Sequence, residues 1–190
     1  MTAPRPTCCV FIACSLDGYI ARADGSLDWL DAVQAKGEDY GYQRFFDAVD
    51  TLVVGRKTYD TVVGFGAWPW AGKRVVVLTH RPPAPVADET FFSGTVKALL
   101  GRLRRAKRRR VYVDGGDVIR QFLVARALDE LTVSLIPVLL GDGVRLFPAG
   151  FPEQRLRLME STAFPTGLVQ VRYRTGPLRR RPATKRRGRG

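Results

Sequence analysis

Short uninterrupted runs of apolar residues alternate along the chain with segments in which apolar residues recur every three or four positions. Uninterrupted runs bounded by turn residues are typical of buried strands, and they cover residues 8–14, 52–54, 75–79, 111–114 and 131–138. The three-to-four spacing is typical of amphipathic helices, and it predicts helices over residues 38–49, 57–63 and 117–127.

A further helix is predicted from an apolar stripe at helical spacing, formed by Val96, Leu99, Leu100 and Leu103. We expect Ser93 to cap its first turn, since a serine hydroxyl accepts a hydrogen bond from the free amides there. Residues 102–110 would form the exposed face and the end of this helix. They include seven basic residues and no acidic one, which is favourable at a helix C-terminus.

Two final strands, over residues 155–163 and 168–174, are expected to pair as a hairpin around the turn Pro165-Thr166-Gly167. Before them, strands alternate with helices. This order predicts an α/β fold with a central, mostly parallel mixed sheet flanked by helices and with antiparallel C-terminal strands. We expect one domain over residues 1–175 and a basic, disordered segment over residues 176–190.

The composition fits one domain with a real core, because 45% of the 190 residues are hydrophobic. The sequence has no apolar run long enough for a membrane span and no secretory signal, so a cytoplasmic location is expected. Cys8 and Cys9 would face opposite sides of one strand, and Cys14 lies near its end, so no disulfide framework is expected. With His80 as the single histidine, no metal site is expected.

The net charge of +13 is concentrated in two places. Residues 102–110 and residues 176–190 each hold seven basic residues and no acidic one, while the rest of the chain has 17 Lys and Arg against 18 Asp and Glu. Such runs are commonly solvated segments, and they can also make weak, non-specific contacts with nucleic acid phosphates. Both interpretations are open at this point.

Two turns suggest a nucleotide cofactor. Gly55-Arg56-Lys57-Thr58 follows the predicted strand 52–54, and Gly115-Gly116 follows the predicted strand 111–114. Each turn leads into a predicted helix, whose free N–H groups and partial positive charge favour phosphate. Two such turns, 60 residues apart, could hold both ends of a dinucleotide.

Over residues 8–174 the chain resembles the dihydrofolate reductase superfamily in three segments that occur in the expected order. The turn that begins at Gly55 matches the first phosphate-binding turn of the family. The segment Leu78-Thr79-His80-Arg81 matches the part that recognises the adenosine end of NADPH. Gly115-Gly116, with the following Gln121-Phe122-Leu123, matches the second phosphate-binding turn.

Two longer motifs point to one branch of this superfamily. Ser15-Leu16-Asp17-Gly18-Tyr19-Ile20-Ala21 and the block over residues 128–147 are similar to the riboflavin-pathway pyrimidine reductases, in particular the C-terminal domain of the bifunctional enzyme RibD. The resemblance implies a homodimeric, NADPH-dependent oxidoreductase. It would transfer a hydride to a pyrimidine- or pteridine-like heterocycle, as 5-amino-6-(5-phosphoribosylamino)uracil reductase does.

Three alternatives are open: dihydrofolate reductase activity, a protein that binds the cofactor without turnover, and a nucleic-acid-associated basic protein on a reductase scaffold. Two departures from the family motifs leave the substrate open. Tyr19 stands where the riboflavin-type motif has a lysine, and Lys73 where folate reductases have the arginine that clamps the folate glutamate.

The resemblance also assigns candidate cofactor roles. Arg56, His80 and Arg81 are cations for the 2′-phosphate of NADPH, with Thr79 as a neutral donor. Lys57 and Thr58 begin a helix that can face the pyrophosphate. The whole cofactor set comprises Ala13, Ile20, Gly55, Arg56, Lys57, Thr58, Leu78, Thr79, His80, Arg81, Gly115, Gly116, Asp117, Val118 and Ile119. Ala13 and Ile20 would line the nicotinamide, while Asp117 would weaken the phosphate turn if it faced inward.

Two carboxylates are candidate proton donors. Counting back from Gly55, Asp39 falls at the carboxylate position of folate reductases. Asp114 precedes the glycine pair, where riboflavin-type reductases have an acidic residue facing the substrate pocket. Each has a structural alternative, a surface acid near a helix N-terminus for Asp39 and a turn-capping aspartate for Asp114.

Overall fold

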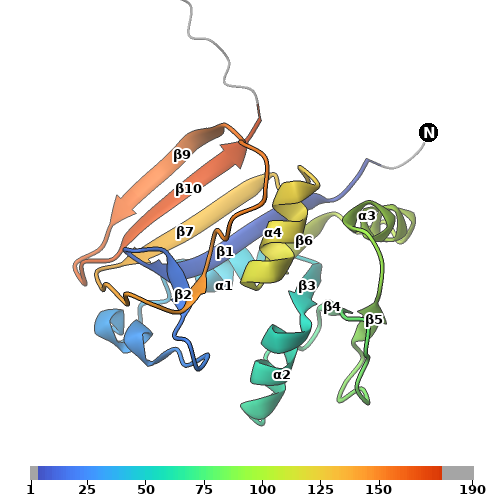
Figure 1. The fold of residues 1–190 in the computed structure, drawn as a ribbon, viewed down its shortest axis with the longest axis horizontal. Coiled ribbons are helices and arrows are strands. Elements are labelled where there is room, and N and C mark those ends of the chain that lie inside the picture. The colour runs from blue at the N-terminus through green and yellow to red at the C-terminus, as the bar shows by residue number, and fades with distance from the viewer. Residues whose placement is uncertain (1–3, 177–190) are drawn as a thin grey trace, which may run out of the picture.

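Eight strands form one sheet in the order β5-β4-β3-β6-β1-β7-β10-β9 in the computed structural model, which describes residues 4–176 (Figure 1). In chain order these strands are β1 (Thr7–Ser15), β3 (Thr51–Gly55), β4 (Arg74–Leu78), β5 (Thr90–Phe92), β6 (Arg110–Asp114), β7 (Glu130–Ile136), β9 (Leu156–Ala163) and β10 (Val169–Thr175). Two short strands, β2 (Tyr19–Ala21) and β8 (Val144–Arg145), pair with each other outside the large sheet.

The six strands from β5 to β7 pair in parallel, and β10 and β9 continue the sheet in antiparallel pairing. This arrangement confirms the predicted α/β fold with antiparallel C-terminal strands. Because parallel strands end at the same edge, the carboxyl ends of β1, β3, β6 and β7 lie together, which is where ligands bind in sheets of this kind.

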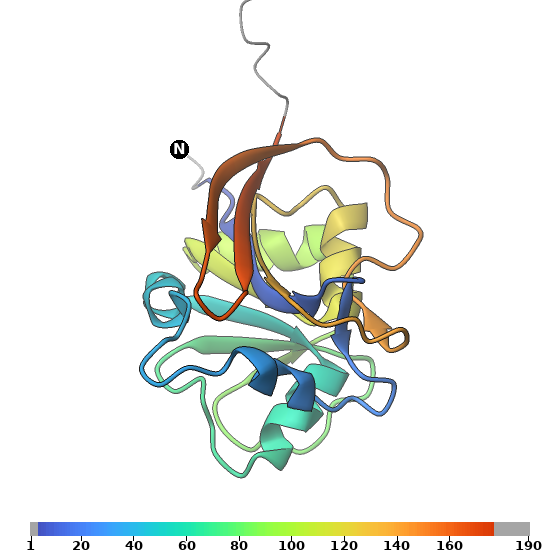
Figure 2. The same ribbon diagram turned by 90° about the vertical axis from the view of Figure 1, so that its left-hand side faces the viewer.

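Helices cover both faces of the sheet (Figures 1 and 2). On one face α3 (Val96–Arg105) and α4 (Gly116–Val124) bury their apolar stripes in the largest core cluster. On the other face α1 (Tyr42–Ala48) and α2 (Arg56–Gly64) pack in a second cluster that is rich in aromatic residues. A 3-10 helix, η1 (Asp28–Val33), belongs to a third cluster near the end of β7.

Two helices are shorter than predicted, for the same reason. The helix expected over residues 38–49 begins only at Tyr42, because Tyr40 and Gly41 have φ angles of 54° and 79°. The helix expected over residues 117–127 spans Gly116–Val124, and Arg126 beyond it has a φ of 50°. A positive φ cannot continue a right-handed helix.

The capping prediction for α3 is wrong. Thr95 caps this helix, because its hydroxyl accepts a hydrogen bond from the amide of Ala98. The hydroxyl of Ser93 instead lies 2.7 Å from the Nδ1 atom of His80. The sequence pattern also misses β2, β5, β8 and η1, since the three strands have only two or three residues and none of the four segments carries a long apolar run. Figure 2 shows the long connection from β8 to β9 crossing the outside of the molecule.

All three cysteines are free and buried. Cys8 and Cys9 belong to the core clusters on opposite faces of the sheet, as the alternation along a strand requires. No helix within residues 4–176 is long and apolar enough to cross a membrane. The predicted disordered segment over residues 176–190 lies, apart from Gly176, outside the described residues.

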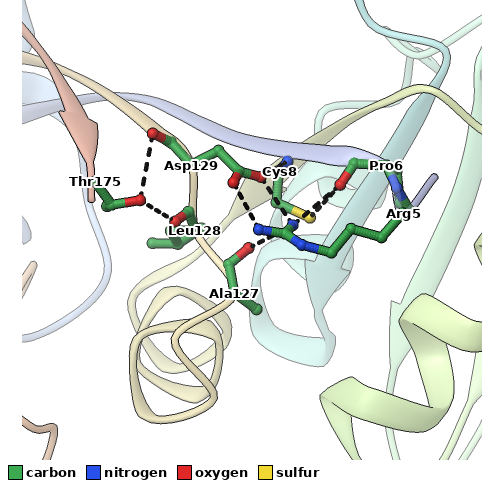
Figure 3. A network of polar contacts seen from close by, with 7 residues as sticks. All are labelled: Arg5, Pro6, Cys8, Ala127, Leu128, Asp129 and Thr175. Carbon is green, nitrogen blue, oxygen red and sulfur yellow. Dashed lines mark hydrogen bonds and ion pairs between the residues drawn. The ribbon is translucent and has the colours of Figure 1, made fainter. Parts of the chain in front are cut away.

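A polar network fastens the ends of the described chain to the start of β7 (Figure 3). The guanidinium of Arg5 donates two hydrogen bonds to Asp129, at 2.9 and 2.6 Å. The same carboxylate accepts the amide of Cys8 at 2.8 Å. Thr175, the last residue of β10, donates through its hydroxyl to the carbonyl of Leu128 at 2.5 Å. These contacts join the beginning of β1 and the end of β10 at the edge opposite the carboxyl ends of the parallel strands.

Candidate functional site

The two glycine turns adjoin at the carboxyl ends of neighbouring strands. Val54 of β3 pairs with Asp114 of β6, so the next residues of the two chains segments, Gly55 and Gly115, lie side by side. A β-carbon placed on Gly115 would stand 2.5 Å from the hydroxyl oxygen of Thr58, in the first turn of α2. The N-termini of α2 and α4 therefore meet, although the two turns are far apart in the sequence.

Close packing explains why both positions after Asp114 are glycine. Gly115 has a φ of 93°, which strains any residue with a β-carbon. A β-carbon on Gly116 would come within 3.1 Å of the carbonyl oxygen of Arg145 and within 3.2 Å of the side chain of Ile20. Ile20 and Arg145 belong to the small sheet of β2 and β8, so this sheet covers the start of α4.

Of the candidate cations, Arg56 lies at the N-terminus of α2 and contacts the backbone of the loop that carries His80 and Arg81. The guanidinium of Arg56 donates to the carbonyl of Arg81 at 2.7 Å and also pairs with Asp60, four residues along the helix, at 2.7 Å. The amide of Arg81 in turn donates to the hydroxyl of Thr79. Residues 79–81 follow Leu78, the last residue of β4, so the β3–β4 pairing brings this loop to Arg56. Lys57 is exposed in the first turn of α2.

The remaining predicted cofactor residues on α4 divide into two kinds. Asp117 is exposed, and its carboxylate points along the helix to Arg120 and Gln121, at 3.3 and 2.8 Å. Val118 and Ile119 are buried in the core, and Val118 packs against Gly55. The side chains of these two residues serve packing, which leaves their backbone as the part that could approach a cofactor.

Asp114 is half-buried at the end of β6, on the face of the sheet that α1 covers. Its carboxylate accepts one hydrogen bond, from the amide of Gly115 at 2.8 Å. Burial raises the pKa of Asp114 to about 6, and that single hydrogen bond offsets only part of the effect. Burial raises the pKa of the nearby Tyr42 and Tyr112, and the negative charge of Asp114 adds to this effect. A carboxyl group with such a pKa can hold and release a proton near neutral pH.

Asp39 is in a different environment. It is exposed, and its two carboxylate oxygens accept the amides of Gly41 and Gln43, each at 2.8 Å. These hydrogen bonds hold the pKa of Asp39 below its ordinary value. Asp39 thus stabilises the free amides at the start of α1 and is ionised at neutral pH.

A cavity of about 250 Å³ lies between β1, the end of β7 and the segment that leads into α1. Ala13 and Asp39 both line it, together with Phe11, Tyr40 and Ser134. A second cavity of about 370 Å³ shares the side chains of Phe11 and Tyr40 and is lined by polar residues that include Arg44, Glu160 and Arg172. Sequence reasoning missed Tyr40, Ser134 and Arg44, because their common location depends on how β7, β10 and α1 pack.

The two motifs of the riboflavin-type branch are in direct contact. The carboxylate of Asp17 accepts the amides of Leu140 and Gly141, at 3.1 and 2.7 Å, and the hydroxyl of Ser15 at 2.5 Å. These hydrogen bonds lower the pKa of Asp17 to about 2. The motif over residues 15–21 and the block over residues 128–147 therefore form one structural unit above the sheet edge.

Both departures from the family motifs have structural roles. The guanidinium of Arg145 lies 4.7 Å from the ring centre of Tyr19 and donates to its hydroxyl at 2.9 Å. Arg145 of β8 thus places a cation beside Tyr19, the position at which the riboflavin-type motif has a lysine. The ammonium of Lys73 donates to the carbonyl of Val49 at 2.8 Å and lies over the ring of Phe46, which ties it to the end of α1.

Comparisons with known proteins agree with this arrangement. The family model of the RibD C-terminal domain matches residues 6–170. The uncharacterized protein YwjB of Bacillus subtilis (strain 168) is 38% identical over 168 residues, which cover 86% of this chain and 95% of that protein. The crystal structure of a putative riboflavin biosynthesis protein from Shewanella sp. PV-4 is similar with a TM-score of 0.85 and 33% identity, covering 90% of this chain and 99% of that one.

The dihydrofolate reductase of Enterococcus faecalis, solved in complex with NADP(H), has the same fold. It superposes with a TM-score of 0.60 at 17% identity, covering 90% of this chain and 97% of that one. The similarities confirm the predicted fold and the predicted branch of the superfamily. Among residues 4–176, no group of three His, Cys, Asp or Glu side chains could hold a metal ion.

Proposed function

Because the chain belongs to the RibD C-terminal domain family, we propose that it is an NADPH-dependent reductase of a pyrimidine- or pteridine-like heterocycle. The observation that carries this proposal is the meeting of the two glycine turns at the carboxyl ends of β3 and β6. A dinucleotide has two phosphates between its two nucleosides, and two adjoining helix N-termini suit such a group.

The residues around these turns fit the cofactor. The backbone at the start of α2 and α4 would bind the pyrophosphate, since Gly115 and Gly116 leave no side chain between it and the helix amides. Arg56 and Arg81 would bind the 2′-phosphate. The guanidinium of Arg56 donates to the backbone carbonyl of Arg81, so Arg56 adds a second cation beside the loop after β4. Asp117 does not oppose this arrangement, because its carboxylate is engaged along the outer side of α4.

When bound, NADPH supplies the hydride. The chain's own contribution is to hold the substrate and to deliver a proton. The cavity lined by Phe11, Ala13 and Ser134 would take the flat heterocycle, with apolar contacts on its faces and the serine hydroxyl as a polar partner. Asp114 would act as the proton donor, because it lies on the same face of the sheet as Phe11 of this cavity and its raised pKa keeps part of the population protonated near neutral pH.

Titration of NADPH and NADH into the purified protein, followed by the fluorescence of Trp29, Trp68 and Trp70, tests the proposal. We expect NADPH to bind more tightly than NADH. Arg56→Ala should weaken NADPH binding by about tenfold, because a charge-assisted contact to phosphate is lost, while NADH binding changes little. Arg172→Ala is the matched control, since Arg172 of β10 pairs with Glu160 of β9, away from the two glycine turns. Failure of both cofactors to bind would contradict the proposal.

We also propose a homodimer that forms through β9, the edge strand of the sheet. Every residue of β9 is exposed, including Leu158 and Met159, which are 52% and 38% exposed. Edge strands with apolar side chains are common contact sites between identical chains. Leu158→Glu should shift the protein to a monomer in sedimentation velocity, and Leu139→Glu, at a position that is 70% exposed outside β9, should not. A wild-type monomer at all concentrations would contradict this part of the proposal.

A further inference from the structure

Ser134 places a buried hydroxyl group in the wall of the proposed substrate cavity. It is only 4% exposed, and it lines the cavity of about 250 Å³ at the end of β7. Within residues 4–176, the side chain that hydrogen-bonds to it is that of Gln170, whose Nε2 atom lies 3.1 Å from the serine oxygen. Gln170 stands directly opposite Ser134 in the antiparallel pair of β10 and β7. The direction of this hydrogen bond decides what Ser134 can offer to a ligand.

A contact with Tyr40 fixes the orientation of the Gln170 amide. The same Nε2 atom donates to the backbone carbonyl of Tyr40 at 3.1 Å. Because a carbonyl oxygen can only accept, the NH₂ end of the amide, and not its oxygen, faces both Tyr40 and Ser134. The serine oxygen must therefore accept the hydrogen bond from Gln170.

Tyr40 is itself held by contacts that do not involve Gln170. Its ring meets the ring of Phe164 edge-on, with ring centres 4.9 Å apart. Its hydroxyl group contacts the carbonyl of Val33 and lies 3.0 Å from the hydroxyl of Thr166. These contacts join the segment before α1 to the turn between β9 and β10. The carbonyl of Tyr40 is thus a well-placed acceptor that keeps the Gln170 amide in one orientation.

Since the oxygen of Ser134 accepts, its hydroxyl hydrogen is left to point elsewhere. The described part of the chain holds no acceptor for it, and a buried polar hydrogen without an acceptor is unfavourable. The other polar side chains of the cavity lining are either engaged, as the hydroxyl of Tyr40 is, or exposed, as are Gln34, Glu38 and Asp39. Ser134 is therefore the buried donor of this cavity.

On the basis of the proposed reductase function, we propose that Gln170 is a positioning residue that makes Ser134 select a carbonyl oxygen, rather than an amino group, on the heterocycle. A carbonyl oxygen would accept the free hydrogen of Ser134. An amino group would bring another hydrogen toward it and leave both without an acceptor. Gln170 acts through Ser134, because it lines the neighbouring cavity of about 370 Å³ and not the one that Ser134 lines.

Two pteridines of the same shape test this inference on the full chain with NADP⁺ bound, so that no hydride is transferred. Pteridine-2,4-dione has carbonyl oxygens where 2,4-diaminopteridine has amino groups, and the fluorescence of both rings allows each Kd to be measured by titration. Gln170→Glu keeps the shape of the side chain but replaces the donor with an acceptor, which turns the hydrogen of Ser134 away from the cavity. The Kd of the dione relative to that of the diamine should rise about tenfold, as expected for one hydrogen bond.

Ser134→Ala separates this role from the effect of the added negative charge. In the Ser134→Ala background, Gln170→Glu should leave the ratio of the two Kd values unchanged within about twofold, because no hydroxyl group remains to be turned. Gln170→Met removes the donor without adding charge and should raise the ratio about threefold, so it decides the question if Gln170→Glu does not fold. Gln154→Glu is the matched control, since Gln154 also donates to a backbone carbonyl, that of Leu123, but lies in the connection before β9.

A rise of the ratio that depends on Ser134 supports the inference. Three outcomes would overturn it: an unchanged ratio in both Gln170 variants, an equal rise in the Ser134→Ala background or in Gln154→Glu, or no binding of pteridine-2,4-dione to the wild-type complex with NADP⁺. Cofactor titration of the wild type before any pteridine is added keeps this result separate from a failure of the proposed reductase function.

Discussion

The hydroxyl oxygen of Thr58 occupies the space that a β-carbon on Gly115 would need, at 2.5 Å from that position. This contact fixes the distance between the first turn of α2 and the turn that starts α4. It is a direct physical link between the two halves of the proposed cofactor site, and a single substitution can change it.

Gly115→Ala should lower the free energy of unfolding by about 2–4 kcal/mol and weaken NADPH binding, because it adds an unfavourable positive φ and a steric clash with Thr58. Gly66→Ala is the control, since Gly66 also has a positive φ but a β-carbon there would contact nothing within 4 Å. Urea unfolding and cofactor titration of both variants check this. Equal losses of unfolding free energy and of NADPH affinity for the two variants would show that the contact with Thr58 contributes to neither.

Asp114→Asn should reduce kcat by about 100-fold or more while NADPH binding stays close to that of the wild type. In the wild type, kcat should fall as the pH rises through about 6, because only the protonated carboxyl group can donate. Steady-state kinetics between pH 5 and about 8.5, with a reducible heterocycle found by screening, test this. A variant that keeps the wild-type rate and pH profile would exclude Asp114 as the donor.

The same carboxylate should also make stability depend on pH. Since the pKa of Asp114 is raised from 3.8 to about 6 in the folded protein, the folded state binds the proton more tightly than the unfolded state. The wild type should therefore lose about 1–3 kcal/mol as pH rises from 4 to above 6, and Asp114→Asn should remove this loss. Chemical unfolding of both proteins at pH 4.5 and pH 8 measures the difference.

For Asp39, we expect stability to depend on pH in the opposite direction, and Asp39→Asn tests this. The pKa of Asp39 is lowered by the amides of Gly41 and Gln43, so its contribution to stability is present above the ordinary pKa and is lost as pH falls below it. We expect Asp39→Asn to be less stable than the wild type at pH 7 and to approach it in acid. Identical pH trends for Asp39→Asn and Asp114→Asn would contradict the contrast between an exposed and a half-buried carboxylate.

The three thiols should be unreactive in the folded protein. Burial raises the pKa of Cys8 and Cys9 to about 12 and that of Cys14 to about 11, so almost no thiolate is present at pH 8. Ellman's reagent should label none of them within minutes under native conditions and all three after denaturation. Rapid labelling of any cysteine in the folded state would show that β1 opens more readily than its packing indicates.

Asp17→Asn should loosen the junction between the loop after β1 and the loop before β8. The carboxylate of Asp17 accepts the amides of Leu140 and Gly141, and a neutral amide side chain is a weaker acceptor. Hydrogen exchange of these two amides should become faster, while the amides of β3 stay protected. Unchanged exchange at Leu140 and Gly141 would show that the loops hold their positions without this carboxylate.

The local pattern of the chain was enough to predict most elements and the branch of the superfamily. Strands such as 111–114 and the stripe of α3 follow from side-chain periodicity, which is a property of neighbouring residues. The exceptions include the short elements β2, β5, β8 and η1, which carry no long apolar run, and the ends of α1 and α4. At these ends Tyr40 and Arg126 have a positive φ, which cannot be predicted from the identity of a residue other than glycine.

Contacts between residues that are far apart in the sequence were decided only by the tertiary structure. Strand order decides that Thr58 fills the space beside Gly115 and that Asp17 holds the loop at Gly141. The contrast between Asp114 and Asp39 is likewise decided by burial and by the number of amides that each carboxylate accepts. The sequence by itself determined which kinds of residue the site can use, because motifs are local. Their contacts, exposure and pKa values came from packing, because these depend on residues that the chain brings together only when it folds.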